Sequence, residues 1–386
     1  MLKLFGLAIV KNESDVIEQF VRHNLRFLDR LFIIDNDSCD NTVEIIRSLA
    51  SEGLPIELWI DPEPLHLQSK KLTAAYHKIS REHDFDFLFL LDADEFIRAC
   101  RREEVEDILL ANRDADVLLI PWQTYVLTGN RSRSDDLFRR ISYRRKSELR
   151  LYHKAIIRHR KDTAERDVIA DGNHNVYSDL HLIRRRIKLP LAHFPVRSKD
   201  QLIYKSVCAW LSIISRSADS KTANSGSQRK AVYDAILCHG DIGQNELRRF
   251  SYWYSTREMH MPATEVKRSV ETVRDQMQWK GVRKYRPKDM GVLVSVLRTA
   301  ESIIDKKMSG TQAKIDQAYF AKYRSKRRIS GELEALNRRI AALEGSTSWR
   351  ITRPIRIAGK LFKWTLRVAR RIARRFFPTL GWAARR

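Results

Sequence analysis

The stretch Phe87-Leu88-Phe89-Leu90-Leu91-Asp92-Ala93-Asp94-Glu95-Phe96 decides the fold class of this chain of 386 residues. Its five consecutive apolar residues are typical of a strand buried on both faces. Three carboxylates then follow within four positions, and like charges this close repel unless positive charge lies among them. A divalent cation is the usual partner, and Mg²⁺ or Mn²⁺ suits carboxylates combined with phosphate oxygens. The alternative is a solvated acidic turn that caps the next helix.

Strands and helices are predicted to alternate through the first third of the chain. Apolar runs predict strands over residues 4–10, 31–34, 56–60, 85–91 and 117–120. Helical spacing predicts helices over residues 16–27, 42–50, 67–79 and 103–110. This order favours an α/β fold with a mostly parallel sheet flanked by helices. Functional groups in such folds gather at the carboxyl ends of strands, where Asp35 and Asp92 are expected.

The later segments have weaker patterns. Strands are predicted over 149–158 and 188–194, a turn over 171–174 and a helix over 198–215. The span 217–228 is rich in Ser, Asn, Gly and Ala and is expected to be a loop. A helical C-terminal extension is expected beyond it.

The charge is unevenly distributed along the chain. The net charge is +24, yet residues 1–97 hold 10 basic and 18 acidic side chains, a net −8 that leaves +32 for the remainder. Such asymmetry favours a polyanionic partner for the basic segments: nucleic acid, an anionic membrane face or a phosphate-bearing substrate. The acidic first third, with no zinc finger and no aromatic-basic RNA motif, makes nucleic acid the unlikely partner.

The cysteines and apolar segments indicate a cytoplasmic protein. The four cysteines, at 39, 100, 208 and 238, form no CxxC pair or zinc knuckle, which favours a reducing compartment. The apolar start at residues 4–10 is short and has no small-residue cleavage site, so no signal peptide is expected. No apolar run reaches 18 residues, so no membrane-spanning helix is expected.

Asp35 begins a second polar cluster, Asp35-Asn36-Asp37-Ser38-Cys39-Asp40-Asn41-Thr42. A carboxylate at a strand end can accept a hydrogen bond from a uracil imide or a ribose hydroxyl. The alternative is an Asx-rich turn that caps the next helix. The chain has neither a GxGxxG after the first strand nor a GxxxxGK[ST], so neither a Rossmann dinucleotide site nor a P-loop is supported.

Three segments, 10–13, 35–42 and 91–96, together resemble the glycosyltransferase family 2 superfamily. The resemblance is closest to the branch that reads Lys-Asn-Glu after the first strand and Asp-Ala-Asp-Glu at the metal motif. It is clear over about residues 1–125 and weaker to about 205. It implies a GT-A type fold, a nucleotide-sugar donor and a divalent cation, Mn²⁺ or Mg²⁺.

The resemblance also implies roles for the first-half residues. Lys11 and Glu13 would lie near the nucleotide and Asp35 near the base. Asp92 and Asp94 would lie at the ribose, metal and diphosphate, with Asp94 as a metal ligand. Glu95 belongs to the same motif without a fixed role. The sequence departs from the family at Asn36, where a second Asp is common.

The second half supplies the remaining candidates. His193 resembles the late histidine that helps to hold the metal or diphosphate, and Arg197 belongs to the same closing region. His174 lies in the turn Asp171-Gly172-Asn173-His174, on the expected acceptor side. Either histidine could instead be a hydrogen-bonded core residue. Asp171 is the candidate general base, because inversion needs a carboxylate on the acceptor side.

Lys71 opens the helix before the metal strand and is a candidate ligand of the diphosphate. The alternative interpretation is that Lys71 lies on a solvated face of this helix.

The chain is predicted to have four parts. These are a GT-A domain over 1–215 (nucleotide-sugar half 1–125, acceptor half 126–215), a helical region over 216–328, a short coiled-coil-like helix over 329–345 and a basic amphipathic tail over 346–386. Apolar residues spaced 4, 3, 4 and 3 from Ile329 to Leu343 favour either a homodimer or a helix packed on its own domain.

The tail is expected to lie on a membrane. Residues 350–386 hold 12 basic and no acidic side chains, with Trp and Phe on the apolar side of a helix. Such a helix can lie in the interface of an anionic leaflet, here the inner face of the cell membrane. The segment Ser346 to Arg356 resembles the end of many bacterial polysaccharide glycosyltransferases.

These observations predict a metal-dependent, inverting glycosyltransferase that moves a hexosyl-type sugar from a nucleoside diphosphate to an acceptor hydroxyl. A glycan or lipid-linked acceptor in cell-surface polysaccharide or glycolipid synthesis is expected from the tail. The competing interpretations are a sugar-nucleotidyltransferase, which usually begins with a Gly-rich basic loop that is missing here, and a non-enzymatic basic protein that binds membrane or nucleic acid.

Overall fold

The apolar run before the carboxylates forms β4 (Phe87–Leu91), a fully buried strand inside a nine-stranded sheet. The computed structural model describes residues 1–63, 67–128, 136–149, 151–216, 227–261, 265–266, 269–279, 283–288 and 291–312. The expected coiled-coil-like helix and basic tail lie outside these residues. Most of the expected loop over 217–228 also lies outside them, and its last two residues belong to a helix that begins at Ser227.

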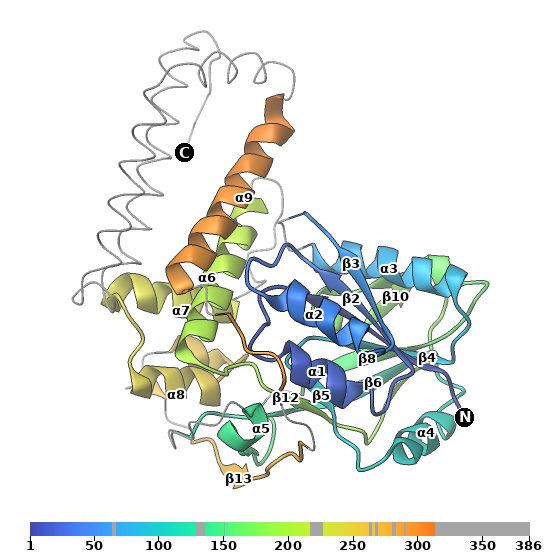
Figure 1. The fold of residues 1–386 in the computed structure, drawn as a ribbon. Coiled ribbons are helices and arrows are strands. Elements are labelled where there is room, and N and C mark those ends of the chain that lie inside the picture. Colours follow the sequence, from blue (N-terminus) through green and yellow to red (C-terminus); the bar gives the residue numbers. More distant parts are fainter. Residues whose placement is uncertain are drawn as a thin grey trace.

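Strands and helices alternate as expected up to β4 (Figure 1). The strands are β1 (Leu4–Val10), β2 (Arg30–Asp35), β3 (Ile56–Ile60), β4, β5 (Glu95–Ile97), β6 (Val117–Thr124), β7 (Tyr143–Arg145), β8 (His153–Arg158), β9 (Asp167–Ile169), β10 (Val176–Ser178), β11 (Arg184–Arg186), β12 (Leu191–His193) and β13 (Thr272–Arg274). The helices are α1 (Ile17–Asn24), α2 (Thr42–Ser51), α3 (Gln68–Glu82), α4 (Arg102–Leu110), α5 (Leu137–Arg140), α6 (Lys199–Arg216), α7 (Ser227–His239), α8 (Gln244–Tyr252) and α9 (Val292–Gln312), with short 3₁₀ turns at Ala164–Arg166 (η1), Asp171–Asn173 (η2) and Arg257–His260 (η3).

The main sheet is mostly parallel, as the sequence predicted. Its strand order is β3-β2-β1-β4-β8-β6-β12-β5, and β11 pairs with β6. Parallel pairs join β1 to β2 and β4, β2 to β3, and β6 to β11 and β12. Antiparallel pairs join β8 to β4 and β6, and β5 to β12. The later strands differ in length from the prediction: β8 and β12 are shorter, and β6 is longer.

Helices cover both faces of the sheet because the side chains of β1 alternate between them. Leu4, Ala8 and Val10 pack into the core beneath α1 and α2. Phe5, Leu7 and Ile9 pack on the other face, against α3. Figure 1 shows α1 and α2 on one side of the strands and α3 on the other. A Cβ at Gly6 would lie 2.8 Å from Leu28 Cδ1 and Leu31 Cδ1, so a larger residue there would force these two buried side chains to shift.

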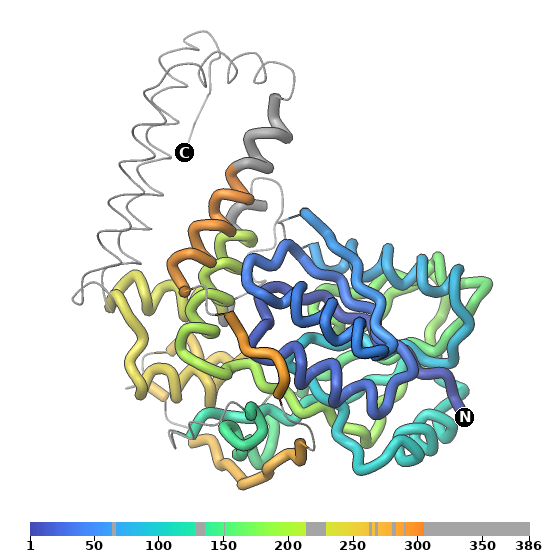
Figure 2. Tube along the Cα trace, in the orientation of Figure 1, coloured from blue at the N-terminus to red at the C-terminus, as the bar shows by residue number. Residues whose placement is uncertain are grey.

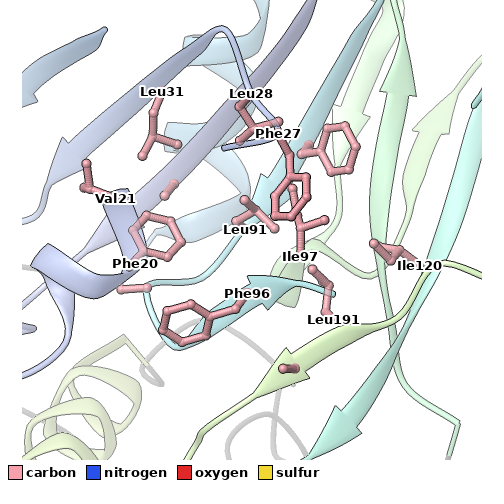
Figure 3. Packing of buried hydrophobic residues seen from close by; sticks show 14 of the residues in the cluster. Phe20, Val21, Phe27, Leu28, Leu31, Leu91, Phe96, Ile97, Ile120 and Leu191 are labelled. Carbon is pink, nitrogen blue, oxygen red and sulfur yellow. The ribbon is translucent and has the colours of Figure 1, made fainter. Parts of the chain in front are cut away.

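Aromatic side chains fill the larger core, in the region drawn in Figure 3. Phe96, directly after the acidic triplet, is fully buried and meets Phe20, Phe138 and Phe194 edge-on at ring separations of 4.9–6.4 Å. These partners come from α1, α5 and the end of β12. The apolar residue that ends the acidic motif therefore anchors the motif to three distant segments.

The helical region begins with α6, which packs against both α7 and α9. Its own core includes Leu202, Ile203, Val232, Ile236 and Phe250. The expected boundary at residue 215 falls at the end of α6, so this helix joins the two regions. Within the described residues, no helix combines the length and the apolar character that a membrane crossing requires.

Residues 283–288 lie beside the N-terminal half, where Figure 2 shows them in orange next to the blue tube. The Glu18 carboxylate accepts hydrogen bonds from the backbone amides of Lys284 and Tyr285 at 2.9–3.1 Å. Arg283 donates to the Ser14 carbonyl at 2.7 Å. The helical region is therefore fastened across the nucleotide half.

Burial makes the stability of this fold depend on pH through His23. Its Nε2–H donates to the Ile97 carbonyl at 2.8 Å, and its ring lies among Phe27, Phe96 and Phe138. Burial lowers the pKa of His23 from 6.5 to about 4, the Ile97 hydrogen bond opposing the shift and Arg26 adding to it.

Below pH 6.5 the unfolded chain therefore binds a proton at this residue that the folded chain refuses. The contribution of neutral His23 to the free energy of unfolding is fully present above pH 6.5 and is lost as the pH falls toward 4. We predict that His23→Gln reduces the loss of unfolding free energy between pH 7 and pH 4 by on the order of 3 kcal/mol. Denaturant titrations at several pH values measure this difference. The exposed His181→Gln should keep the wild-type pH dependence, and equal behaviour of the two variants would contradict the prediction.

Candidate functional site

The first parallel strands end at one edge of the sheet, and the candidate residues gather there. The turns that follow β1, β2 and β4 carry Lys11 to Asp15, Asn36 to Asp40, and Asp92 to Asp94. The end of β12 and the first half of α6 complete this edge. A cavity of about 260 Å³ opens between these segments.

Asn12 fixes the turn after β1. It adopts a left-handed backbone (φ 53°), and its side-chain oxygen accepts from the Cys39 amide at 2.8 Å. The Ser38 hydroxyl accepts from the Asn12 amide, and the Thr42 hydroxyl accepts from the Glu13 amide, both at 2.9 Å. The turns after β1 and β2 thus hold each other, and this places Glu13 at the cavity.

Asp92 is held by donors from three other segments. Oδ2 accepts from Lys154 Nζ at 2.6 Å, and Oδ1 accepts from Asn173 at 3.2 Å and from Gln68 at 3.4 Å. The side chain is 32% exposed and lines the cavity. Asp92 therefore lies at the site, with both carboxylate oxygens engaged by the chain itself.

Asp94 is more deeply buried and faces three basic side chains. Its Oδ2 lies 3.2 Å from Lys205 Nζ and 3.5 Å from an Arg197 guanidinium nitrogen, and its Oδ1 lies 3.9 Å from His193 Nε2. The β12 register brings the histidine here, because His193 pairs with Glu95 on β5 and with Thr124 on β6. The Phe194 amide also donates to the Asp94 carbonyl at 2.9 Å.

Glu95 points away from the cavity and stabilises the turn that follows β4. Its Oε2 accepts from the Asp92 amide at 2.9 Å, and its Oε1 lies 3.5 Å from Lys154 Nζ. The residue is completely buried, and burial raises its pKa well above the usual value although Lys154 opposes the shift. It therefore shapes the acidic turn from behind.

Arg197 joins three carboxylates below the cavity. Its fully buried guanidinium contacts Glu13 at 2.5 Å, Asp15 at 2.7 Å and Asp94 at 3.5 Å. Lys205 on α6 contacts Glu13 at 2.8 Å and Asp94 at 3.2 Å. The sequence led us to assign the positive charge among the carboxylates to a metal. In the structure, the chain's own Lys154, Arg197 and Lys205 supply a large part of this charge.

The protonation states follow from this arrangement. Burial acts to raise the pKa of Asp94, but the positive charges of Lys205 and Arg197 outweigh it and the pKa falls below its usual range. Burial lowers the pKa of His193 to about 3, with Asp94 opposing the shift. Near neutral pH the pair is a carboxylate beside a neutral imidazole, the states in which both side chains ligate metals.

Six of the predicted site residues line the cavity: Lys11, Glu13, Asp92, Asp94, His174 and His193. Lys11 Nζ has no hydrogen-bond partner among the described residues, and its nearest carboxylate is Asp37 at 3.6 Å. His174 donates from Nδ1 to the His153 carbonyl at 2.7 Å, and burial lowers its pKa to about 4.

The other predicted residues lie outside the cavity lining. Besides Glu95 and Arg197, these are Asp35, Lys71 and Asp171. Asp35 is buried behind the turn after β2, where its Oδ2 accepts from the Ser38 amide at 3.0 Å. Lys71 binds Asn36 at 2.5 Å and Asp61 at 2.9 Å, so it supports the wall of the cavity.

Asp171, the candidate general base, does not line the cavity. Its carboxylate is exposed and accepts from the Ser69 amide at 3.1 Å, in a separate groove beside α3. The neighbouring Gly172 and His174 do line the cavity. The left-handed Gly172 (φ 78°) turns the chain between them, so Asp171 and His174 face different sides. This position argues against a direct role of Asp171 in proton transfer.

Several cavity residues escaped the sequence analysis. Lys154 is 1% exposed, and the signal for it was a lysine directly before the apolar run Ala155-Ile156-Ile157 of the same strand. Trp122 stacks on His193 with ring centroids 4.0 Å apart, and Tyr254 meets the same imidazole at 5.7 Å. Nothing local distinguishes these aromatic residues from core residues.

A divalent cation fits this donor set. Within the described ranges, no group of three or more His, Cys, Asp or Glu side chains converges as a complete metal site. Mg²⁺ and Mn²⁺ are often held by one or two protein ligands together with substrate phosphates and water. Asp94 Oδ1 and His193 Nε2 offer such a partial set at the cavity wall.

The fold and the edge on which the site lies define an α/β protein of the GT-A type. Residues 7–188 match the model of the family "Glycosyl transferase family 2". This part of the chain is similar to that family of glycosyltransferases. The match includes the second half of β1 and all of β2 and β4, with Asp35 at the end of β2 and the turns that carry Lys11 and Asp94. A comparison with curated proteins gave no match.

Comparison with solved structures gave similar chains of low identity. Staphylococcus aureus TarS 1–349 is 15% identical, with 60% of this chain and 70% of that chain covered and a TM-score of 0.27. Mannosyltransferase PcManGT from Pyrobaculum calidifontis, in complex with GDP-Man and Mn²⁺, is 12% identical, with 62% and 76% covered and a TM-score of 0.31.

The charge balance at Arg197 leads to a stability prediction. Arg197→Met would remove the ion pairs that Arg197 makes with the buried Glu13 and Asp94 and with the partly buried Asp15, so we expect the free energy of unfolding to fall by about 3–5 kcal/mol. The matched control is Arg166→Met, which breaks an exposed pair with Asp179 and should cost less than about 1 kcal/mol. Chemical denaturation compares the two. Equal losses would show that Arg197 is not the central counter-ion.

Proposed function

We propose that this protein transfers a sugar from a nucleoside-diphosphate sugar to an acceptor hydroxyl in a metal-dependent reaction. The observation that carries the proposal is the pair Asp94 and His193, 3.9 Å apart on the wall of a cavity that basic side chains surround. A carboxylate and a neutral imidazole suit a hard divalent cation, and the cations around them suit a diphosphate.

Asp94 and His193 would hold the cation, Mn²⁺ or Mg²⁺. When bound, the cation offsets negative charge on the diphosphate leaving group. Lys205 approaches Asp94 from α6 and lines the same cavity, so it holds a fixed positive charge beside the leaving group. Lys11, whose ammonium is without a hydrogen-bond partner in the described structure, would bind the nucleotide at the end of β1.

The base of the nucleotide would lie toward the turn after β2. Asn36 lines the cavity, and Lys71 fixes its side chain through a 2.5 Å hydrogen bond. Asp35 Oδ1 is buried and has no hydrogen-bond partner in the described part of the chain. A base amide could satisfy it once the turn adjusts, and this keeps the role that the family resemblance gives to Asp35.

The acceptor would enter from the side that the helical region builds. Cys208, Ala209 and Ser212 of α6 line this wall, together with Thr299 of α9 and Arg229 of α7. We infer that a glycan or lipid-linked acceptor lies here, in the synthesis of cell-surface polysaccharide or glycolipid. The inverting course and hexosyl transfer follow from the family resemblance, with no side chain assigned as the base.

We propose a location at the membrane from the sequence of the tail, residues 346–386. Its basic, aromatic helix would bind an anionic surface, which would place the enzyme on the inner face of the cell membrane. Homodimer formation through residues 329–345 belongs to the same proposal.

Nucleotide binding tests the donor site. We expect one of UDP, GDP, dTDP and CMP to bind in calorimetry in the presence of Mn²⁺, and the affinity to fall at least about tenfold without the metal. Asp94→Asn should lose most of this metal-dependent affinity because it removes a charged ligand. Asp84→Asn, at an 83% exposed side chain, is the control and should bind like the wild type. Metal-independent binding, or full affinity in Asp94→Asn, would contradict the proposal.

Vesicle binding tests the tail. The full chain should sediment with vesicles that contain anionic lipid, since each Lys or Arg near the surface contributes about 1 kcal/mol. A chain that ends at residue 345 should stay in the supernatant, and neutral vesicles should bind neither form. Unchanged sedimentation after the truncation would refute the membrane role.

A further inference from the structure

Lys154 is a buried cation at the acidic motif, and neither the sequence motif nor the family match assigns it a role. We propose that Lys154 is an internal counter-ion that engages Asp92, so that a single divalent cation is held by Asp94 and His193 alone. Asp92 would then be a positioning residue rather than a metal ligand. This inference rests on the proposed metal-dependent function.

The contacts of Lys154 use most of its hydrogen-bonding capacity. An ammonium has three donors. One donates to Asp92 Oδ2 at 2.6 Å, a second donates to the Gly172 carbonyl at 2.8 Å, and Glu95 Oε1 lies 3.5 Å away. The Trp122 ring centroid lies 5.5 Å from Nζ, within the range of a cation–π contact.

The position of β8 makes these contacts rigid. Lys154 pairs with Ile120 in the β8–β6 ladder, and β8 is antiparallel to β4 on its other side. The Lys154 side chain is 1% exposed, so water cannot take the place of its hydrogen-bond partners. A buried ammonium costs several kcal/mol unless a charge compensates it. Asp92 and Glu95 supply that compensation, and the three side chains form one unit.

The two aspartates of the motif are therefore not equivalent. Both oxygens of Asp92 accept hydrogen bonds, from Lys154 on one side and from Asn173 and Gln68 on the other. Asp94 has its basic partners on Oδ2, while Oδ1 faces His193 and accepts no hydrogen bond within the described residues. An incoming cation can use Asp94 Oδ1 without breaking a contact, whereas at Asp92 it would displace a charged partner.

Lys154 also connects the acidic motif to the turn 171–174. Its bond to the Gly172 carbonyl and the bond from Asn173 to Asp92 both hold this turn against the end of β4. A side chain at Gly172 is excluded, because a Cβ would lie 2.6 Å from His174 Cδ2. The lysine thus sets both the charge of the metal site and the position of the wall opposite it.

Removing the lysine should make the site more attractive to cations. We would measure binding of Mn²⁺ alone to the full chain by electron paramagnetic resonance of free Mn²⁺. Lys154→Met leaves Asp92 without its cation, so Mn²⁺ affinity should rise about tenfold or a second equivalent should bind. Lys154→Arg keeps the charge and should stay near the wild type. Weaker Mn²⁺ binding by Lys154→Met would overturn the proposal.

The aspartates provide the second comparison. Asp94→Asn should lose Mn²⁺ binding at least about tenfold, whereas Asp92→Asn should change it by less than about threefold. Equal losses in the two variants would show that Asp92 is a metal ligand and would overturn the proposal.

If Lys154→Met does not fold, the double variant Lys154→Met/Asp92→Asn removes both charges of the pair and should bind Mn²⁺ as the wild type does. Loss of Mn²⁺ binding in this double variant would also overturn the proposal. A wild-type chain that binds Mn²⁺ but none of the tested nucleotides would refute the proposed function and leave this inference standing.

Discussion

The structure depends on the neutralisation of buried carboxylates at the carboxyl edge of the sheet. Arg197 contacts Glu13, Asp15 and Asp94, and Lys205 reaches Glu13 and Asp94 from α6. A buried carboxylate without a partner costs several kcal/mol, so these cations are as necessary to the edge as the apolar core beneath it. Because each cation comes from a segment far along the chain, the edge forms only when the whole domain is assembled.

This requirement explains why the helical region is part of the candidate site. Helix α6 packs with α7 and α9 on one side, and on the other it sends Lys205 to the carboxylates and the Tyr204 hydroxyl to the Asn12 carbonyl. Residues 283–288 fasten the same region to Glu18. The cavity thereby acquires a second wall, built from α6, α7 and α9.

The same charge balance prepares the edge for its chemistry. The cations lower the pKa of Asp94 although burial opposes this, and burial keeps His193 neutral. The three carboxylates have different neighbours: Asp94 turns one oxygen toward His193, Asp92 is engaged by Lys154, and Glu95 accepts a hydrogen bond from the Asp92 amide. Three acidic residues adjacent in sequence thus have three separate tasks, because their side chains meet different neighbours.

Local sequence determined the first half of this arrangement. Apolar runs and helical spacing fixed β1, β2 and β4, and with them the strand ends at Asp35 and Asp92, because such patterns depend only on nearby residues. Tertiary structure alone decided that β8 enters antiparallel between β4 and β6 and carries Lys154 to the acidic motif. It also decided that the β12 register sets His193 beside Asp94 and that Gly172 turns Asp171 away from the cavity. Strand pairing and turn direction depend on contacts between residues far apart in the chain, and no local pattern records them.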